Sequence, residues 1–322
     1  MRKKQFGITL AGICLGLLLC SCGKQESKKE ESQKQAEQTG NQSEYISFTV
    51  TKEEGDKLQM YTYMYDLEKE EISQKGETEY TAQYPLTVYD ESNDYIYYSQ
   101  RDETDCDQLA RKNLTTGEEK VLTDSLFAIN YIIPINENVY VAAVQKGERA
   151  VGLYSYAEGK LKRVLEDSDA FVWRINVNPA AKQVVLNTYS QSELDKNMES
   201  NEGDEDIGTN TIWTLDIQDG KIAKIAEVES GDMTNIGIKE EGEIYYNIAE
   251  LRKLEDGKKE VCHEFDGLNL KEFIYLNGDQ IYYIDWDDNI VKYDKTQDKK
   301  ETIFTVEEDL AALNNAIVLS GE

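Results

Sequence analysis

The sequence has few of the residues on which most enzyme active sites depend. The chain of 322 residues contains one histidine, His263, in a short apolar stretch at 261–265 that we expect to be an outer strand. A Ser-His-Asp or Cys-His site would have to use this unfavourably placed residue. G-x-S-x-G, G-x-x-x-x-G-K-[ST] and H-E-x-x-H signatures are also absent. We therefore expect no enzyme and no cofactor, although two of the 63 acidic residues could still pair to cleave a glycosidic bond.

Cysteines that could form a disulfide or a metal site are also scarce. Three of the five cysteines, Cys14, Cys20 and Cys22, lie at the N-terminus. The other two, Cys106 and Cys262, fall in parts of the chain that we expect on opposite sides of the fold, too far apart to bridge. Neither has metal-ligand spacing with a histidine or another cysteine. We predict no disulfide and no metal site.

Positive charge is low compared with negative charge. The chain has 35 Lys and Arg against 63 Asp and Glu, a net charge of −28. Because residues 1–21 carry three cations and residues 22–43 are neutral, residues 44–322 carry about −31. Such a surface repels nucleic acid, so we expect no nucleic-acid partner. Solubility explains the negative charge best. The alternative explanation is that the surface binds cations or basic peptides.

Helical periodicity and long apolar runs are nearly missing. Only residues 306–315 show a helical pattern, which disfavours a solute-binding lipoprotein with two α/β lobes. The longest apolar run covers residues 6–19 and is too short to span a bilayer comfortably.

That apolar run belongs to an N-terminal targeting segment. It follows three cations at residues 2–4 and ends in Leu19-Cys20-Ser21-Cys22. This arrangement resembles the lipobox of bacterial lipoproteins, in which a cysteine after a small residue becomes lipidated. The resemblance implies a signal peptide at 1–21 and a palmitate-type anchor on Cys22, holding the protein on the extracytoplasmic face of the cell membrane. The alternative is an ordinary secretory signal with incidental cysteines.

Residues 22–43 are rich in Gln, Glu, Lys and Ser and cannot bury enough apolar surface to order themselves. We expect a flexible linker there.

The remaining sequence consists of short β-type runs separated by turn residues. Residues 84–124 contain four such runs, with a polar turn at 91–94 and a second turn at 115–118, where Gly117 supplies a positive φ. A single four-stranded meander of this kind exposes two apolar faces. It therefore needs neighbours of the same kind.

Those neighbours are present as repeats of the two turns. The first turn recurs at 135–138, 178–181, 240–243 and 277–280, and the second at 158–160, 219–221, 256–258 and 297–299. Four strands in about 40–45 residues are typical of propeller blades.

The two ends of the chain complete the count of blades. Residues 316–322 match the first strand at 273–279, whereas the folded region begins at 44–48 as if with a second strand. We therefore predict an all-β, six-bladed β-propeller over residues 44–322, with four-stranded antiparallel blades. Its C-terminal strand joins the N-terminal blade and closes the ring.

The repeat resembles the blades of TolB-like β-propellers. The stretch from Ile96 to Thr123, which ends L-T-T-G and V-L-T, is the closest match, although the S-P-D-G first turn of that family is mostly lost. The resemblance implies binding or scaffolding rather than a named reaction. The S-x-D-x-G-x-x-W box of sialidase-like propellers is absent.

The loops between second and third strands are the best place for a site, because they vary most and emerge on one face. The blade-four insertion, residues 190–210, is acidic but lacks Asp-x-Asp-x-Asp-Gly spacing, so we interpret it as solvated charge. We expect most tyrosines, and Trp173 and Trp213, to pack in the core. The candidate binding residues lie in the blade-two and blade-six loops: Asp102, Asp105, Asp107, Asp285, Trp286 and Asp287.

These observations predict a lipid-anchored, extracytoplasmic binding or scaffold propeller. Its partners would be the membrane, through the anchor, and an envelope protein or glycan, through the loops; we expect a monomer. One alternative is a carbohydrate-active enzyme, a glycosidase or lyase, that uses paired carboxylates at the central channel.

Overall fold

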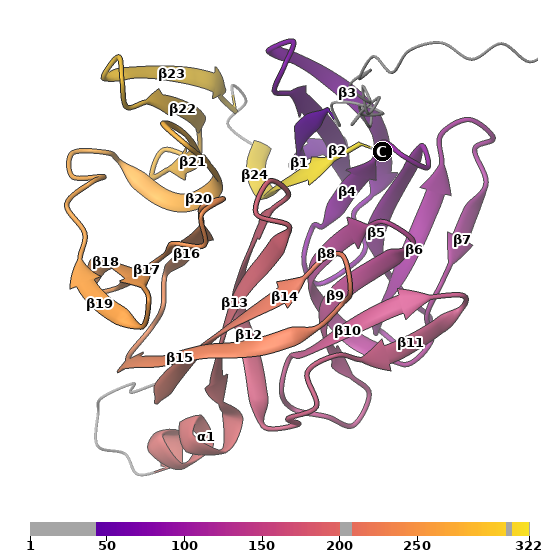
Figure 1. Ribbon diagram of the computed structural model, residues 1–322. Coiled ribbons are helices and arrows are strands. Elements are labelled where there is room, and N and C mark those ends of the chain that lie inside the picture. The colour runs from indigo at the N-terminus through magenta and orange to yellow at the C-terminus, as the bar shows by residue number, and fades with distance from the viewer. Residues whose placement is uncertain (1–42, 200–207, 307–310, 322) are drawn as a thin grey trace, which may run out of the picture. The chain divides into compact units, whose positions relative to one another are not determined.

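The computed structural model describes residues 43–199, 208–306 and 311–321, which belong to one compact unit, Asn41–Glu322. Within these ranges, 24 strands form six antiparallel sheets of four strands each, the blades of a β-propeller (Figure 1). The fold predicted from the repeats is therefore confirmed. Cys22 and all but the last residue of the expected linker lie outside the described residues.

Blades 1 to 3 are formed by residues 44–163, with the C-terminal strand of the chain added to blade 1. Blade 1 consists of β24 (Ala311–Ser320), β1 (Glu44–Glu54), β2 (Lys57–Asp66) and β3 (Glu71–Glu79). Blade 2 consists of β4 (Thr87–Asp90), β5 (Tyr95–Arg101), β6 (Asp107–Asn113) and β7 (Glu119–Val121). Blade 3 consists of β8 (Leu126–Ile135), β9 (Asn138–Gln145), β10 (Gly152–Ala157) and β11 (Lys160–Arg163).

The other three blades follow in sequence order. Blade 4 consists of β12 (Ala170–Asn178), β13 (Gln183–Ser190), β14 (Thr209–Asp216) and β15 (Ile222–Ser230), with helix α1 (Gln191–Glu199) inserted after β13. Blade 5 consists of β16 (Asn235–Ile238), β17 (Ile244–Ile248), β18 (Glu250–Glu255) and β19 (Lys258–Val261). Blade 6 consists of β20 (Leu270–Asn277), β21 (Gln280–Asp285), β22 (Ile290–Asp294) and β23 (Lys299–Phe304).

The C-terminal strand closes the ring, as predicted. β24 is the first strand of blade 1 and pairs antiparallel with β1, so that Ile317 lies opposite Ser47 and Leu319 opposite Tyr45. Figure 1 shows the yellow β24 beside the indigo β1. This pairing covers an edge of β1 that would otherwise be free to bind other strands.

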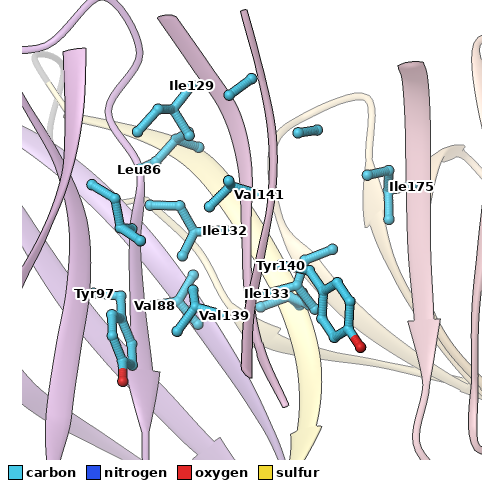
Figure 2. Packing of buried hydrophobic residues seen from close by; sticks show 14 of the residues in the cluster. Leu86, Val88, Tyr97, Ile129, Ile132, Ile133, Val139, Tyr140, Val141 and Ile175 are labelled. Carbon is cyan, nitrogen blue, oxygen red and sulfur yellow. The ribbon is translucent and has the colours of Figure 1, made fainter. Parts of the chain in front are cut away.

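The core lies between blades rather than within any one of them. One buried cluster joins residues of blades 1 to 4, and Figure 2 shows aliphatic side chains of blades 2 and 3 within it. Separate clusters fill the spaces between blades 6 and 1, between 4 and 5, and between 5 and 6. Each sheet therefore depends on its neighbours to keep its apolar faces away from water.

The turn residues have the backbone conformations that the sequence predicts. Gly117 has φ of +74°, and Glu158 and Gly159 have φ of +50° and +76°. Two successive residues with positive φ are typical of the tight hairpin turns that match strand twist.

The aromatic residues and cysteines also lie largely where expected. Tyr97, Tyr98, Tyr245, Tyr246, Tyr282 and Tyr283 are all buried. Trp213 and Trp173 are both partly buried and pack against core clusters. Cys106 and Cys262, in blades 2 and 5, are buried free thiols.

Two helical expectations need correction. Residues 311–315 of the expected helix belong to β24, because pairing with β1 outweighs their local helical preference. Helix α1 instead lies in the insertion at 190–210, for which no helix was expected.

His263 does not lie in an outer strand as expected. β19 ends at Val261, and the imidazole is exposed in the link to blade 6, with Nδ1 3.0 Å from Oδ2 of Asp266. Across the described ranges, none of the helical structure is both long and apolar enough to cross a membrane.

Candidate functional site

The connections of the propeller emerge at two opposite ends. We call the end that carries the loops between second and third strands, together with the links between blades, the loop face. The opposite end carries the turns between first and second strands and between third and fourth strands, and we call it the turn face. The predicted binding residues lie at or near the loop face, in blades 2 and 6.

Asp102 organises the loop of blade 2 with its own carboxylate. Oδ1 accepts hydrogen bonds from the backbone N of Thr104 at 2.7 Å and of Cys106 at 3.1 Å. Oδ2 accepts from Gln108 Nε2 at 3.0 Å and from Lys146 Nζ, of blade 3, at 3.2 Å. The hydrogen bond from the Thr104 hydroxyl, followed by the others, holds the pKa of Asp102 well below its usual range.

The other two acids of this loop differ sharply in exposure. Asp107 is fully buried; its Oδ2 accepts from the backbone N of Gln83 at 2.9 Å, and Arg101 lies 3.7 Å from Oδ1. Burial raises the pKa of Asp107, although Gln83 and Arg101 oppose that shift. Asp105 is exposed and has φ of +57°. Of these three acids, Asp105 is the one whose carboxylate is most open to a ligand.

Trp286 is the most exposed aromatic residue of the described chain. Its side chain is 65% exposed in the loop of blade 6. Asp285 holds this loop, because its Oδ1 accepts from the backbone N of Asp287 at 3.0 Å and of Asn289 at 2.9 Å. Oδ2 of Asp287 accepts from Asn269 at 3.2 Å. The two acids therefore fix the loop that presents the indole to solvent.

These acids do not form a metal centre. Asp102, Asp105 and Asp107 belong to blade 2, and Asp285 and Asp287 to blade 6. Nowhere in the described ranges do three metal-ligating side chains gather around one point. Whether any of the six predicted residues contacts a ligand stays a prediction.

Sequence reasoning missed most of the exposed apolar side chains on the loop face. Besides Trp286, four large apolar residues project there from blades 1, 3 and 4 and from the link between blades 1 and 2. Because these residues lie within or directly beside loops, their exposure could have been predicted from the sequence. These four are Leu58, Tyr84, Phe127 and Met198, which are 43%, 48%, 45% and 71% exposed.

A group of aromatic residues lies where β12 enters blade 4 from the loop face. Phe171 stacks on Tyr189 at 4.8 Å between ring centroids, and Trp173 lies 6.2 Å from both rings. Trp173 donates from Nε1 to Oδ1 of Asp232 at 2.9 Å, and the guanidinium of Arg174 lies 4.8 Å from its ring. This group stiffens the loop face between blades 4 and 5.

Farther along β12, towards the turn face, two asparagine side chains cross from blade 4 to blades 5 and 6. Nδ2 of Asn176 donates to the carbonyls of Phe273 and Ile274, both at 3.1 Å. Nδ2 of Asn178 donates to the carbonyls of Ile238 at 2.7 Å and Leu276 at 3.0 Å. These amides bind the first strand of blade 4 to those of blades 5 and 6.

A small cavity with one carboxylate lies on the channel axis. Its lining includes Tyr131, Asn176 and Glu272, and among the lining residues Glu272 alone is acidic. Burial raises the pKa of Glu272, and the positive charges of Arg174 and Lys271 partly offset this rise. Burial also raises the pKa of Tyr131 to about 12, helped by the charge of Glu272. A paired-carboxylate hydrolase would need a second acid within about 10 Å on this wall.

The six blades and the closing strand define the class of protein as a six-bladed β-propeller with a TolB-like fold. Among solved structures, the crystal structure of TolB from Acinetobacter baumannii is similar, with a TM-score of 0.53 and 13% identity. The similarity covers 85% of this chain and 66% of that protein, slightly less than two thirds of its length. At this identity the likeness shows the fold alone. No family model and no curated protein matches the sequence.

Proposed function

We propose that the protein is a lipid-anchored, extracytoplasmic binding module that recognises a protein of the cell envelope through its loop face. The anchor rests on the lipobox-like residues that end in Cys22. The binding role rests on the propeller fold and on the apolar residues that the loop face exposes.

The distribution of exposed apolar residues carries this proposal. Of the nine large apolar side chains that are exposed in the described chain, the five named above lie on the loop face. The other four lie on the outermost strands of blades 1, 2, 4 and 5: Ile72, Val121, Ile225 and Val261. In a domain with a charge of about −31, exposed apolar side chains at one end are typical of an interaction site.

A protein fits this surface better than a small ligand does. The five side chains come from four blades and one link, so a partner that contacts them all must span much of the face. Aromatic and Met anchors inside a polar rim are the usual composition of protein interfaces. A glycan stacked on Trp286 is the alternative for the same face, and the test below separates the two.

Site-specific photocrosslinking in living cells tests the loop face. A photoreactive amino acid replaces Phe127 or Trp286 on the loop face and, as a control, Glu158 in a tight turn of blade 3 on the turn face. We expect a discrete protein adduct from both loop-face positions and none from position 158. Adducts sensitive to glycosidase would favour the glycan, and equal labelling at all three positions would reject a specific loop-face partner.

The anchor has its own test. Cys22→Ser should leave the chain without lipid, so that metabolic labelling with a palmitate analogue disappears and the protein leaves the membrane fraction. Cys20→Ser is the matched control and should change neither result. Unchanged membrane association of the Cys22 variant would support an ordinary secretory signal or another attachment.

A further inference from the structure

A groove of about 600 Å³ lies between blades 3 and 4. It runs from their turns on the turn face to Val164 and Glu166 in the link between the two blades. The volume suits a ligand of two or three sugar rings. Nδ2 of Asn136, in the first turn of blade 3, donates to the carbonyl of Ile217 in blade 4 at 3.2 Å, which ties the two blades together beneath the groove.

Tyr140 presents its hydroxyl to this groove. The residue is 4% exposed, and Figure 2 shows its ring beside Ile133 with the hydroxyl pointing away from the aliphatic residues. This hydroxyl is not one of the fully buried atoms that lack a partner, so it lies at the accessible wall of the groove, where a ligand can reach it. Burial raises the pKa of Tyr140, with the charges of Asp216 and Asp219 adding to the effect, so the group stays protonated and can donate.

Gly220 opposite leaves room for that hydroxyl. A Cβ at this position would lie 3.2 Å from the Tyr140 oxygen, and the backbone φ of +69° favours glycine. The position of Gly220 therefore keeps the approach to the hydroxyl open.

Further groups along the groove can both donate and accept hydrogen bonds. The side chains of Asn138, Ser155 and Gln218 line it. Val164 and Ile217, both partly buried against the core, add apolar surface. Hydroxyl and amide groups beside an apolar strip complement a sugar ring, whose hydroxyls donate and accept and whose C–H face is apolar.

The charges around the groove are mixed. Lys162 is balanced by Glu137 and Glu166, while Arg163 is already paired with Glu148, and Asp219 with Lys221. No large apolar side chain of the described residues is exposed in these turns, so the groove lacks the anchors that a protein partner would need.

We infer that this groove is a second binding site, which takes a short neutral oligosaccharide and whose main donor is the hydroxyl of Tyr140. The inference does not depend on the loop-face partner, because none of the five exposed apolar side chains on which that proposal rests lines the groove.

Calorimetric titration of the full-length protein tests this site. The protein is purified in lauryldimethylamine oxide, which carries no sugar, and titrated with neutral tetrasaccharides of glucose, galactose, mannose, xylose and N-acetylglucosamine. We expect at least one to bind with a Kd below about 1 mM. Binding of none of the five would overturn the inference.

Variants then locate the bound sugar. Tyr140→Phe removes only the hydroxyl and should weaken binding about tenfold, as the loss of one buried hydrogen bond predicts. Tyr97→Phe, at the equivalent position of β5 in blade 2, is the matched control and should bind as the parent does. Trp286→Ala should also leave the affinity unchanged. If Trp286→Ala abolishes binding, or if Tyr140→Phe binds as tightly as the parent, the groove is not the site.

Discussion

At the scale of single residues, the ring is held by polar side chains that cross from one blade to the next. Glu264, in the link between blades 5 and 6, is the best example. It accepts a hydrogen bond from Lys239 at 2.8 Å and another from Lys295 of blade 6, while the Tyr245 hydroxyl lies 3.0 Å from its Oε2. Although burial alone would raise its pKa, these hydrogen bonds lower the pKa of Glu264 to about 2.

We expect Glu264→Gln to destabilise the protein by about 1–3 kcal/mol at pH 7. The folded-state pKa lies below the ordinary value of 4.5, so this carboxylate stabilises the fold fully above about pH 5 and loses its effect as the pH falls toward 2. Urea unfolding at pH 7 and pH 3 measures the difference between variant and parent, which should shrink at pH 3. Glu260→Gln, at an exposed strand position, is the control and should have little effect. A difference that is independent of pH would contradict this account.

Asn178 gives a second prediction at this scale. Its fully buried amide donates to two carbonyls of blades 5 and 6, so Asn178→Asp, which has the same shape but no donor, should cost about 2–4 kcal/mol at pH 7. Urea unfolding measures this cost. Asn138→Asp, at a partly exposed position, is the matched control. Equal stability of the two variants would show that the amide of Asn178 does not hold the blades together.

At the scale of elements, β24 is the strand on which ring closure depends. Val318 is fully buried between blades 6 and 1. A carboxylate there has no partner, so Val318→Asp should destabilise the fold by more than about 4 kcal/mol and release β24 from β1. Limited proteolysis would then cut within Ala311–Ser320, a segment that stays protected in the control Ala312→Ser, where the side chain is exposed. Continued protection in the Val318 variant would mean that backbone pairing alone closes the ring.

Elements that repeat were predictable, and those that occur once were not. Strands and turns recur with the same types of residue in each blade. The fold, and the role of the C-terminal strand as the first strand of blade 1, could therefore be inferred from local sequence patterns. Residues 311–315 look helical alone, and only pairing with β1 makes them a strand. Helix α1 did have a signal: Ser190 and Glu193 form the start of a capping box, and the Ser190 hydroxyl accepts from the Glu193 backbone N at 3.1 Å.

The candidate site was predictable only in part, for a similar reason. Loop position and the exposure of Trp286 follow from flanking turn residues. The buried carboxylate of Asp107, the hydroxyl of Tyr140 and the groove between blades 3 and 4 depend on how separate blades meet. A single sequence does not contain that information in any local pattern.

At the scale of the whole molecule, no blade can bury its faces alone, so the propeller should unfold as one unit. The structure supplies two reporters: Cys106 and Cys262 are free thiols, each 8% exposed, in blades 2 and 5. Residues 41–322 with either Cys106→Ser or Cys262→Ser retain a single thiol. Pulses of a thiol reagent across a urea series then measure the exposure of each blade. We expect the two labelling midpoints to coincide, because the apolar clusters link every blade to the next. Earlier labelling of one thiol would mean that part of the ring opens independently, and the interfaces between blades would then be weaker than their burial indicates.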